Sequence, residues 1–324
     1  MTKNNNIFNY VIYFLLFFTF NHFFSSYTAK FAIDDERKNY KLIEKYLLND
    51  SSLANSQKPI LWIHNAYERN SKKWNDFSSR GGENLNEPYK TLCIKSIIKK
   101  CGKSFNVCLI NDKSFNKLIP GWSIELSKIA SPIKENIRKL ACYKLLYNYG
   151  GILVPNSFFC FNDLNNIFKK IDKNNYCFSF EKQCKKSFSE NNLCANTDFV
   201  GCSKNNNVIK DLINYQEIKS SSDHSFESNF KGGLQEQFLS HISNNKMKLL
   251  SGKLIGIKDN NENFISIDQL LGEDYININE TIFGIYIPSD ELNNRTKINW
   301  FTRMSIEQIL ESDMIISKHM LYHN

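Results

Sequence analysis

Residues 131–157 read SPIKENIRKLACYKLLYNYGGILVPNS, and this stretch decides the fold. Ser131 is a suitable helix N-cap, and Pro132 fits the first helical turn. Apolar residues then recur at three- and four-residue spacing, which predicts an amphipathic helix with one buried face. The pair Gly150-Gly151 ends that helix, and the β-forming run 152–154 follows at once. The stretch therefore predicts a helix that leads through two glycines into a buried strand.

Short apolar runs upstream of this stretch predict further strands. Residues 59–64, PILWIH, form the first run. A helix is predicted from Pro88 to Gly102, with apolar positions again three and four residues apart. Residues 105–110 form the next run. Strand, helix and strand in this order are typical of a parallel crossover unit.

The remainder of the chain continues the alternation of strands and helices. Strands are predicted at 176–180, 199–202, 254–257 and 264–267, and helices at 234–243 and after Ser305. The predicted fold class is therefore α/β, with a sheet between layers of helices in one domain.

The N-terminus carries a long apolar segment, IFNYVIYFLLFFTFNHFF, at residues 7–24. Its length lies between the about 20 residues of a membrane-spanning helix and the about 7 to 15 of a signal-peptide core. Because the residues after it fit a cleavage site poorly, we predict an uncleaved type II anchor in 1–25, a polar stem in 26–57 and one domain in 58–324. The domain would then lie on the lumenal face of the ER or Golgi. The alternative is a chain secreted after signal cleavage.

Composition and charge exclude several classes of protein. With 42% hydrophobic and 14% aromatic residues, the 324-residue chain is too apolar for a disordered protein. Its net charge of +8 comes from lysines that are spread along the chain rather than gathered in a stripe. We therefore predict no nucleic-acid partner.

Nine cysteines lie between Cys93 and Cys202, and none forms a CxxC pair. Without such pairs, and without a histidine at ligand spacing, no zinc site is predicted. In a lumenal domain the odd number predicts some disulfides and at least one free thiol, with candidates in Cys177, Cys184, Cys194 and Cys202. In a reducing compartment the same cysteines would be small core residues.

The stretch at 137–157 resembles the sugar-binding DXD region of family 32 glycosyltransferases and the related capsular-polysaccharide synthesis proteins, in its order of helix, Tyr-Gly-Gly and strand. Residues 59–65, PILWIHN, are similar to that family's first strand, and residues 196–201, NTDFVG, to a later one. The resemblance covers residues 58–210. It implies a GT-A-like, Rossmann-related mixed sheet flanked by helices. It also implies transfer of a hexose from a nucleotide sugar to a glycan or protein acceptor, with retention of anomeric configuration.

The resemblance further implies a donor-binding site. Its candidate residues are His64, Asn65, Arg138, Lys139, Gly150, Gly151, Asn156 and Ser157, with Asp198 as the candidate catalytic base. Plainer structural explanations exist for several of them: an interior histidine at His64, a helix C-cap at the glycines, and a turn residue at Asp198.

The residues that hold a metal ion in that family are replaced here. The family's Asp-X-Asp, whose carboxylates hold Mn²⁺ or Mg²⁺ against the diphosphate, falls on Pro155, Asn156 and Ser157. The Asp and Arg of its helix fall on Lys139 and Cys142. We therefore predict no metal ligands. Mn²⁺ or Mg²⁺ is implied as a cofactor by the resemblance alone.

Two functions remain open from these residues. An active transferase would work without metal, with Arg138, Lys139 or Lys144 supplying the positive charge that the leaving diphosphate needs. A catalytically inactive GT-A-like module would keep the fold and only bind ligands or partners. A structural surface protein that is cross-linked by its cysteines is a third hypothesis.

Several other residues are weaker candidates. The C-terminal Arg295, Trp300 and Arg303 either close over a sugar or form a core tryptophan with surface arginines. A missing metal ligand would come from Glu181, Glu236, Asp259 or Asp268, among which the sequence does not select.

Overall fold

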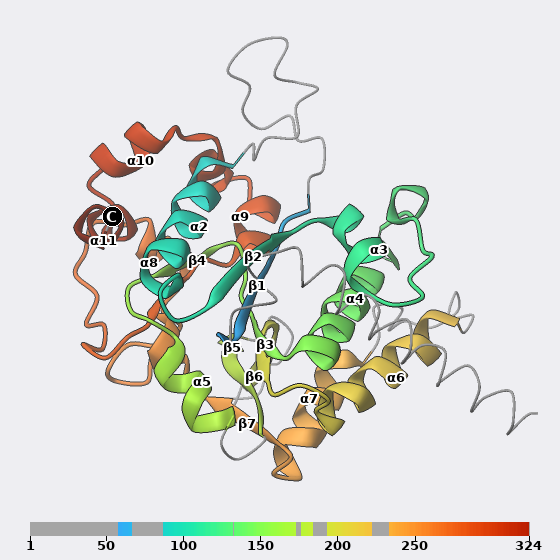
Figure 1. The fold of residues 1–324 in the computed structure, drawn as a ribbon. Helices are drawn as coiled ribbons and strands as arrows, with labels where there is room; N and C mark the ends of the chain where they lie inside the picture. Colours follow the sequence, from blue (N-terminus) through green and yellow to red (C-terminus); the bar gives the residue numbers. More distant parts are fainter. Residues whose placement is uncertain are drawn as a thin grey trace, which may run out of the picture. The chain divides into compact units, whose positions relative to one another are not determined.

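The computed structural model describes residues 58–66, 87–131, 133–172, 176–183, 193–221 and 233–323 (Figure 1). The predicted N-terminal anchor and stem lie outside these residues. Within the described part of the chain, no helix combines the length and the apolar character that crossing a bilayer requires. Residues 116–123 belong to a compact unit separate from the rest.

The main sheet has six strands in the order β2-β1-β3-β6-β5-β7. They are β1 (Ile60–His64), β2 (Asn106–Ile110), β3 (Gly151–Leu153), β5 (Cys177–Gln183), β6 (Leu193–Cys202) and β7 (Met247–Leu250). β1 pairs in parallel with β2 and β3, and β5 in parallel with β7, whereas β6 runs antiparallel to both of its neighbours. The predicted mixed sheet is confirmed. A second, two-stranded sheet pairs β4 (Phe158–Cys160) with β8 (Gly284–Tyr286).

Helices flank the main sheet, as the α/β prediction requires. The longer helices are α2 (Pro88–Cys101), α4 (Ile133–Tyr149), α5 (Asn165–Asp172), α6 (Asn207–Ser221) and α7 (Leu234–Ser243). Short helices follow β7 and β8: α8 (Ile267–Leu270), α9 (Ser289–Asn294), α10 (Ile306–Glu311) and α11 (Ile315–His323). α4, α6 and α7 lie on one side of the sheet, and α2 with the C-terminal helices lies on the other (Figure 1).

The two helices with clear sequence signals form where they are predicted. α2 has Pro88 at its first position and ends one residue before Gly102. Its predicted apolar stripe, which includes Tyr89, Leu92 and Ile97, is buried. α4 buries Ile137, Leu140, Leu145 and their neighbours on one face. Proline at the start and glycine after the end explain why these boundaries could be read from the sequence.

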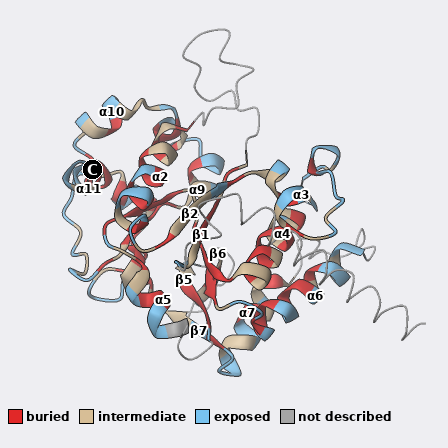
Figure 2. Cartoon of the chain, in the orientation of Figure 1, coloured by how far each residue is buried: buried red, intermediate tan, exposed pale blue. Residues whose placement is uncertain are grey.

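Aromatic side chains fill the core between the main sheet and α2. Phe158, Phe178, Phe180 and Phe199 belong to one buried cluster. Figure 2 shows that much of the main sheet is buried. The rings of Phe180 and Phe199 lie 4.5 Å apart between centroids, and those of Phe158 and Phe199 lie 5.0 Å apart at 68°. Such tilted and edge-to-face pairs add to the free energy gained by burying the rings.

The prediction of strands at 254–257 and 264–267 is wrong. Residues Gly252–Ile255 form a 3-10 helix that Ser251 caps and that ends at Gly256, whose φ is +68°. In the second segment, Phe264 makes an isolated bridge to Lys258, and Ser266 caps α8 with a capping box. The capping serines and the left-handed glycine outweigh the β-propensity of the isoleucines.

The cysteines are mostly free thiols. Of the four predicted disulfide candidates, Cys194 is in a disulfide, whereas Cys177 and Cys202 are fully buried and not disulfide-bonded. Cys184 lies outside the described residues. The prediction is therefore wrong for Cys177 and Cys202, which are small core residues at the paired ends of β5 and β6.

Candidate functional site

A cleft of about 1040 Å³ opens at the carboxyl ends of the parallel strands β1 and β3. It is lined from β1 by His64, from the residues after β3 by Asn156 and Ser157, from α4 by Arg138 and Lys139, and from β6 by Asp198. Six of the nine predicted site residues therefore share one cleft. The carboxyl edge of a parallel sheet is where α/β proteins usually bind their ligands, because loops and helix starts converge there.

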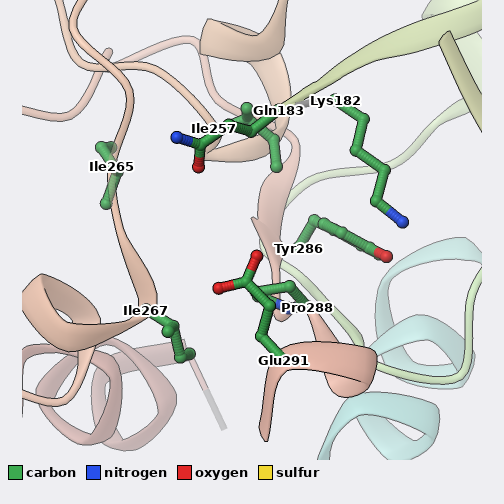
Figure 3. Close-up of a pocket in the computed structure, with 8 residues that line it drawn as sticks. All are labelled: Lys182, Gln183, Ile257, Ile265, Ile267, Tyr286, Pro288 and Glu291. Atoms are coloured by element: carbon green, nitrogen blue, oxygen red, sulfur yellow. The ribbon is translucent and has the colours of Figure 1, made fainter. Parts of the chain in front are cut away.

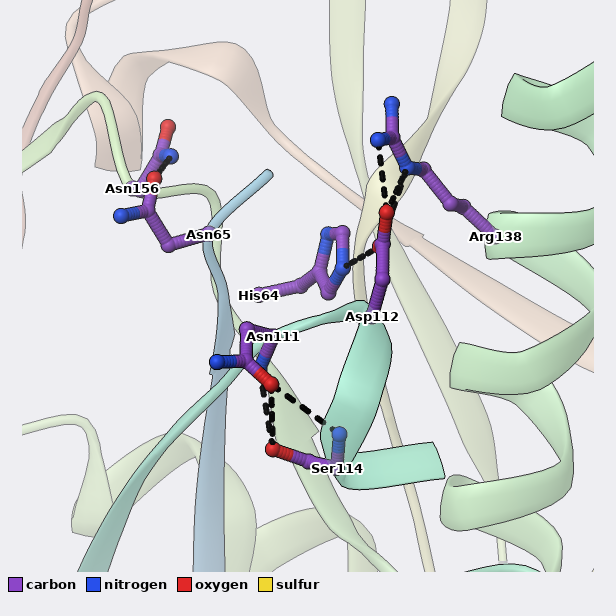
Figure 4. Close-up of polar contacts among 7 residues, drawn as sticks. All are labelled: His64, Asn65, Asn111, Asp112, Ser114, Arg138 and Asn156. Carbon is purple, nitrogen blue, oxygen red and sulfur yellow. Dashed lines mark hydrogen bonds and ion pairs between the residues drawn. The ribbon is translucent and has the colours of Figure 1, made fainter. Parts of the chain in front are cut away.

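At the end of β1, the side chains of His64, Asp112 and Arg138 form a hydrogen-bonded group (Figure 4). His64 Nε2 lies 2.9 Å from Asp112 Oδ1. Arg138 donates from Nε and Nη2 to the same carboxylate, at 3.0 Å and 2.7 Å. The fork of the guanidinium thus matches the two carboxylate oxygens, a geometry that also fixes the side chain's orientation.

Asp112 is a site residue that the sequence analysis missed. It follows Asn111, which caps the next turn by accepting from the Ser114 amide. The signal that could have identified Asp112 is its position directly after β2, a parallel neighbour of β1. Partial burial raises the pKa of its carboxyl, but His64 and Arg138 outweigh burial and lower the pKa to about 2. The carboxyl is therefore ionised at neutral pH.

Replacing Asp112 by Asn is expected to remove stability that depends on pH. The folded-state pKa lies below the ordinary value of 3.8, so the contribution is complete above about pH 4 and is lost as the pH falls towards 2. The lowered pKa corresponds to about 2 kcal/mol of folding stability at neutral pH. Solvent screening reduces this figure little, because the carboxylate is only 26% exposed. Urea unfolding at a series of pH values should show the variant less stable at pH 7, with the difference shrinking below pH 4.

A suitable control for that measurement is Asp268→Asn. Asp268 pairs with Arg295 at 2.6 Å, but both side chains are largely exposed, and exposed ion pairs contribute little. This variant should show a much smaller pH-dependent difference. An Asp112 variant whose stability deficit stays constant from pH 7 to pH 2 would contradict the assignment of this carboxylate.

A second charged group lies at the middle of the cleft. Lys139 Nζ is 2.5 Å from Thr197 Oγ1 and 3.2 Å from Asp198 Oδ1. The two charged side chains are 29% and 43% exposed, so both face the cleft. Burial raises the pKa of the Asp198 carboxyl, but Lys139 and Lys182 lower it more, and the net shift is downward. Asp198 is therefore a carboxylate whose ionised form Lys139 and Lys182 stabilise.

Lys182, on β5, is the other residue that the sequence analysis missed. Its Nζ lies 4.0 Å from Asp290 Oδ2 and 5.7 Å from the ring centroid of Tyr286. Tyr286 raises the pKa of Lys182 despite burial, so the ammonium keeps its proton. Tyr286 and Asp290 both line the cleft, and Tyr286 also lines a small adjoining pocket of about 20 Å³ with Lys182 (Figure 3).

Asn65 lies beside the cleft and holds one of its lining residues. Its side chain is 1% exposed, and its Oδ1 accepts from Asn156 Nδ2 at 3.0 Å. The Asn65 amide donates to Ile110 O on β2 at 2.8 Å. Within the described residues, Asn65 Nδ2 has no hydrogen-bond partner. This pair of asparagines positions the loop that follows β3.

The structure places Gly150, Gly151 and Lys144 away from the cleft. Gly150 and Gly151 stand at the amino end of β3, whereas the cleft lies at its carboxyl end. Gly150 O accepts a 3.0 Å hydrogen bond from Trp62 Nε1, which indicates a packing role. Lys144, the third cation considered on α4, pairs with Glu217 of α6 at 2.7 Å and does not line the cleft.

The cleft does not offer a site suited to a divalent metal ion. Within the described residues, no three His, Cys, Asp or Glu side chains are grouped so that they could hold one. The loop after β3 presents Pro155, Asn156 and Ser157, and the nearby carboxylate of Asp198 is paired with Lys139. Hard cations need several oxygen ligands with negative charge among them. No step that uses a metal ion is therefore derived for this site.

The weaker candidates do not line the cleft either. Glu181 pairs with Lys258, Asp268 with Arg295, and Asp259 accepts from neighbouring amides of its own loop. Glu236 is an exposed residue of α7. The three residues considered as a cover for a sugar, Arg295, Trp300 and Arg303, are also absent from the lining, and Trp300 is 44% exposed rather than in the core.

Comparisons with known proteins give little beyond this geometry. The chain matches no protein-family model and no curated protein. A solved structure titled "PaToxG Glycosyltransferase" aligns with 65% of this chain and 78% of its own length, at 13% identity and a TM-score of 0.32. A similarity of this size does not establish a common fold, so the likeness to family 32 glycosyltransferases remains a resemblance of local sequence.

Proposed function

We propose that the cleft binds a nucleotide sugar and that the chain transfers its hexose to a glycan or protein acceptor without a divalent metal ion. The observation that supports this proposal is the gathering of Arg138, Lys139 and Asp198 in one cleft at the carboxyl edge of the sheet. A volume of about 1040 Å³ is large enough for a ligand of nucleotide-sugar size. The mixed sheet flanked by helices agrees with a GT-A-like architecture.

The two cations of α4 would bind the charged part of the donor. A diphosphate leaving group carries negative charge that grows as the glycosidic bond breaks, and fixed cations stabilise it. Arg138 is held in place by Asp112, so its guanidinium is oriented before the donor arrives. Lys139 is shared with Asp198 and Thr197, so it would have to exchange the carboxylate for a phosphate oxygen.

Asp198 would act as a fixed negative charge more than as a base. A general base works best when its pKa lies near the working pH, and the pKa of Asp198 is lowered instead. An ionised carboxylate next to the anomeric carbon stabilises the positive charge that develops there during glycosyl transfer. Lys182 would remain as its counter-ion when Lys139 turns to the diphosphate.

The second candidate function is a binding module without catalysis. It is favoured by the pairing of both α4 cations with carboxylates, which opposes the binding of a diphosphate, and by the lack of carboxylates in the loop after β3. Such a module would bind a sugar or a partner in the same cleft. It would show no turnover with any donor.

A donor panel separates these two functions. Calorimetry with UDP- and GDP-sugars, followed by transfer and hydrolysis assays in EDTA, should reveal at least one donor that binds and turns over. Lys139→Ala and Arg138→Ala should each weaken donor binding by about 10-fold or more, since each removes a charge-assisted contact. Lys144→Ala is the matched control, because it removes a lysine from the same helix outside the cleft.

The outcomes have distinct meanings. Donor binding without turnover would favour the binding module. No binding by any donor would refute the proposed function. Equal losses in the Lys139 and Lys144 variants would show that the charge acts at long range and not as a contact.

We also propose, from the N-terminal segment alone, that the chain is anchored with its domain on the lumenal face of the ER or Golgi.

A further inference from the structure

Two buried thiols meet between α2 and β4, outside the cleft. Cys101 is the last residue of α2, and Cys160 is the last residue of β4. Both side chains are 0% exposed, and their Sγ atoms lie 3.8 Å apart. They belong to the same hydrophobic cluster as the phenylalanines of the main sheet. The proposed transfer reaction uses neither residue.

Hydrogen bonds on both sides hold the two sulfurs opposite each other. The Cys160 amide donates to Ser96 Oγ at 2.8 Å, and Ser96 Oγ donates to Cys93 O at 2.7 Å. Beyond the sulfurs, Ser104 Oγ donates to the Asp163 carboxylate. α2 and β4 are thus tied together before and after the thiol pair, which limits how far the sulfurs can separate.

We propose that Cys101 and Cys160 are a disulfide-forming pair that a small oxidising disulfide closes when local opening between α2 and β4 exposes one of the two sulfurs. A disulfide needs the sulfurs about 2.05 Å apart, so they must approach by about 1.8 Å through rotation of the side chains. In the first step one thiolate attacks the oxidant RSSR, forms a mixed disulfide and releases one RS⁻. In the second step the other thiolate attacks the cysteine sulfur of the mixed disulfide. This attack closes the bond between the two cysteines and releases the second RS⁻. The two cysteines lose two electrons and two protons, and two RSH form.

Cys101 is the better first nucleophile of the pair. The contact between the two thiols lowers the pKa of Cys101, whereas that contact and burial raise the pKa of Cys160. The attacking species in thiol–disulfide exchange is the thiolate, so the lower pKa favours Cys101. The Cys160 thiol also lies 3.2 Å from Asn162 O.

Closing this pair would constrain the unfolded chain. The two cysteines are 59 residues apart, and a cross-link over a loop of that length removes much of the freedom of the denatured state. The expected result is a rise in Tm of about 5 °C. In an oxidising compartment the cross-linked form would prevail, whereas a reducing compartment would keep the thiols.

The test uses the full chain treated with oxidised glutathione, followed by alkylation of the remaining thiols and peptide mapping. We expect a peptide pair joined through Cys101 and Cys160, together with the rise in Tm. Cys160→Ala should abolish both results. Cys93→Ala is the matched control, because Cys93 lies on the same helix and is equally buried, and it should show the same oxidant-dependent rise as the wild type.

Two outcomes would overturn the proposal. One is a map in which Cys101 and Cys160 are both recovered as alkylated thiols after prolonged oxidation of folded protein. The other is a map in which Cys101 or Cys160 is joined to a different cysteine of the chain. If Cys160→Ala fails to fold, the peptide map of the wild type decides the matter alone. The test does not depend on donor binding or transfer.

Discussion

Replacing Asp198 by Asn is expected to tighten the binding of UDP or GDP and, at the same time, to lower hexosyl transfer by about 10²-fold or more. In the free protein the Asp198 carboxylate competes for Lys139, which it approaches to 3.2 Å. Removing its charge leaves Lys139, which lines the cleft, available to a diphosphate. Because the pair is partly exposed, the gain in affinity should be modest, about 3- to 10-fold.

Transfer should fall because the charge at the reacting carbon loses its stabilising partner. An isosteric amide keeps the shape of the side chain but carries no negative charge. Calorimetry with the nucleoside diphosphate and a transfer assay with the sugar donor measure the two effects separately. Changes in opposite directions are the signature of a group that opposes ground-state binding and stabilises the transition state.

Asp290→Asn provides the comparison within the same cleft. Asp290 is 73% exposed and lies 4.0 Å from Lys182, so the loss of its charge should change both quantities much less. Weaker diphosphate binding by the Asp198 variant would show that this carboxylate does not compete for Lys139. If transfer were unchanged, Asp198 would not be a catalytic residue. The proposal that the cleft binds the donor would still stand.

The parts of the fold that could be predicted are those with strong local signals. Pro88 begins α2 and Gly102 follows its end, while Gly150 separates α4 from β3, which begins at Gly151. These boundaries follow from conformational limits of single residues. The failed strand at 254–257 has the opposite cause. Its isoleucines and leucine favour a strand, but Ser251 and Gly256 fix a 3-10 turn whose stability depends on packing that the sequence does not display.

The candidate site was predictable where the chain order places residues at strand ends. His64 ends β1, Asn156 follows β3, and Arg138 and Lys139 lie on the helix that leads into β3, so topology brings them together. Lys182 could not be found in this way. The predicted strand stopped at 180, whereas β5 continues to Gln183 because it pairs with β6 through a register shift between Ser179 and Glu181. That pairing joins residues that are distant in the sequence, so the local pattern around Lys182 does not reveal it.

The two glycines show how sequence proximity can mislead. They lie within seven residues of Asn156 and Ser157 in the chain, which suggested a shared role in donor binding. β3 separates them in space, because the glycines lie at its amino end and the cleft lies at its carboxyl end. The helix C-cap and close-packing explanation accounts for Gly150 and Gly151 without a ligand.

Replacing Gly151 by Ala is therefore expected to damage the fold rather than the site. Its φ is +103°, a region that residues with a Cβ rarely adopt, and an added Cβ would lie 2.0 Å from the carbonyl oxygen of Ile60. That carbonyl belongs to β1, which is held by β2 on one side and β3 on the other, so it cannot move away. Backbone strain and overlap together should lower the free energy of unfolding by about 4 kcal/mol.

Urea unfolding of Gly151→Ala beside Gly272→Ala measures this loss against a matched glycine substitution. A Cβ at Gly272 would lie 3.3 Å from the nearest atom, Asp268 O, and its φ lies outside the left-handed range, so we expect a change below about 1 kcal/mol. A Gly151 variant as stable as the Gly272 variant would mean that β1 and β3 are not packed as described. If the variant folds at low temperature, its affinity for a nucleoside diphosphate should equal that of the wild type, because the cleft lies at the other end of β3. A selective loss of affinity with stability preserved would return Gly151 to the donor site and would place the phosphate at the amino edge of the sheet.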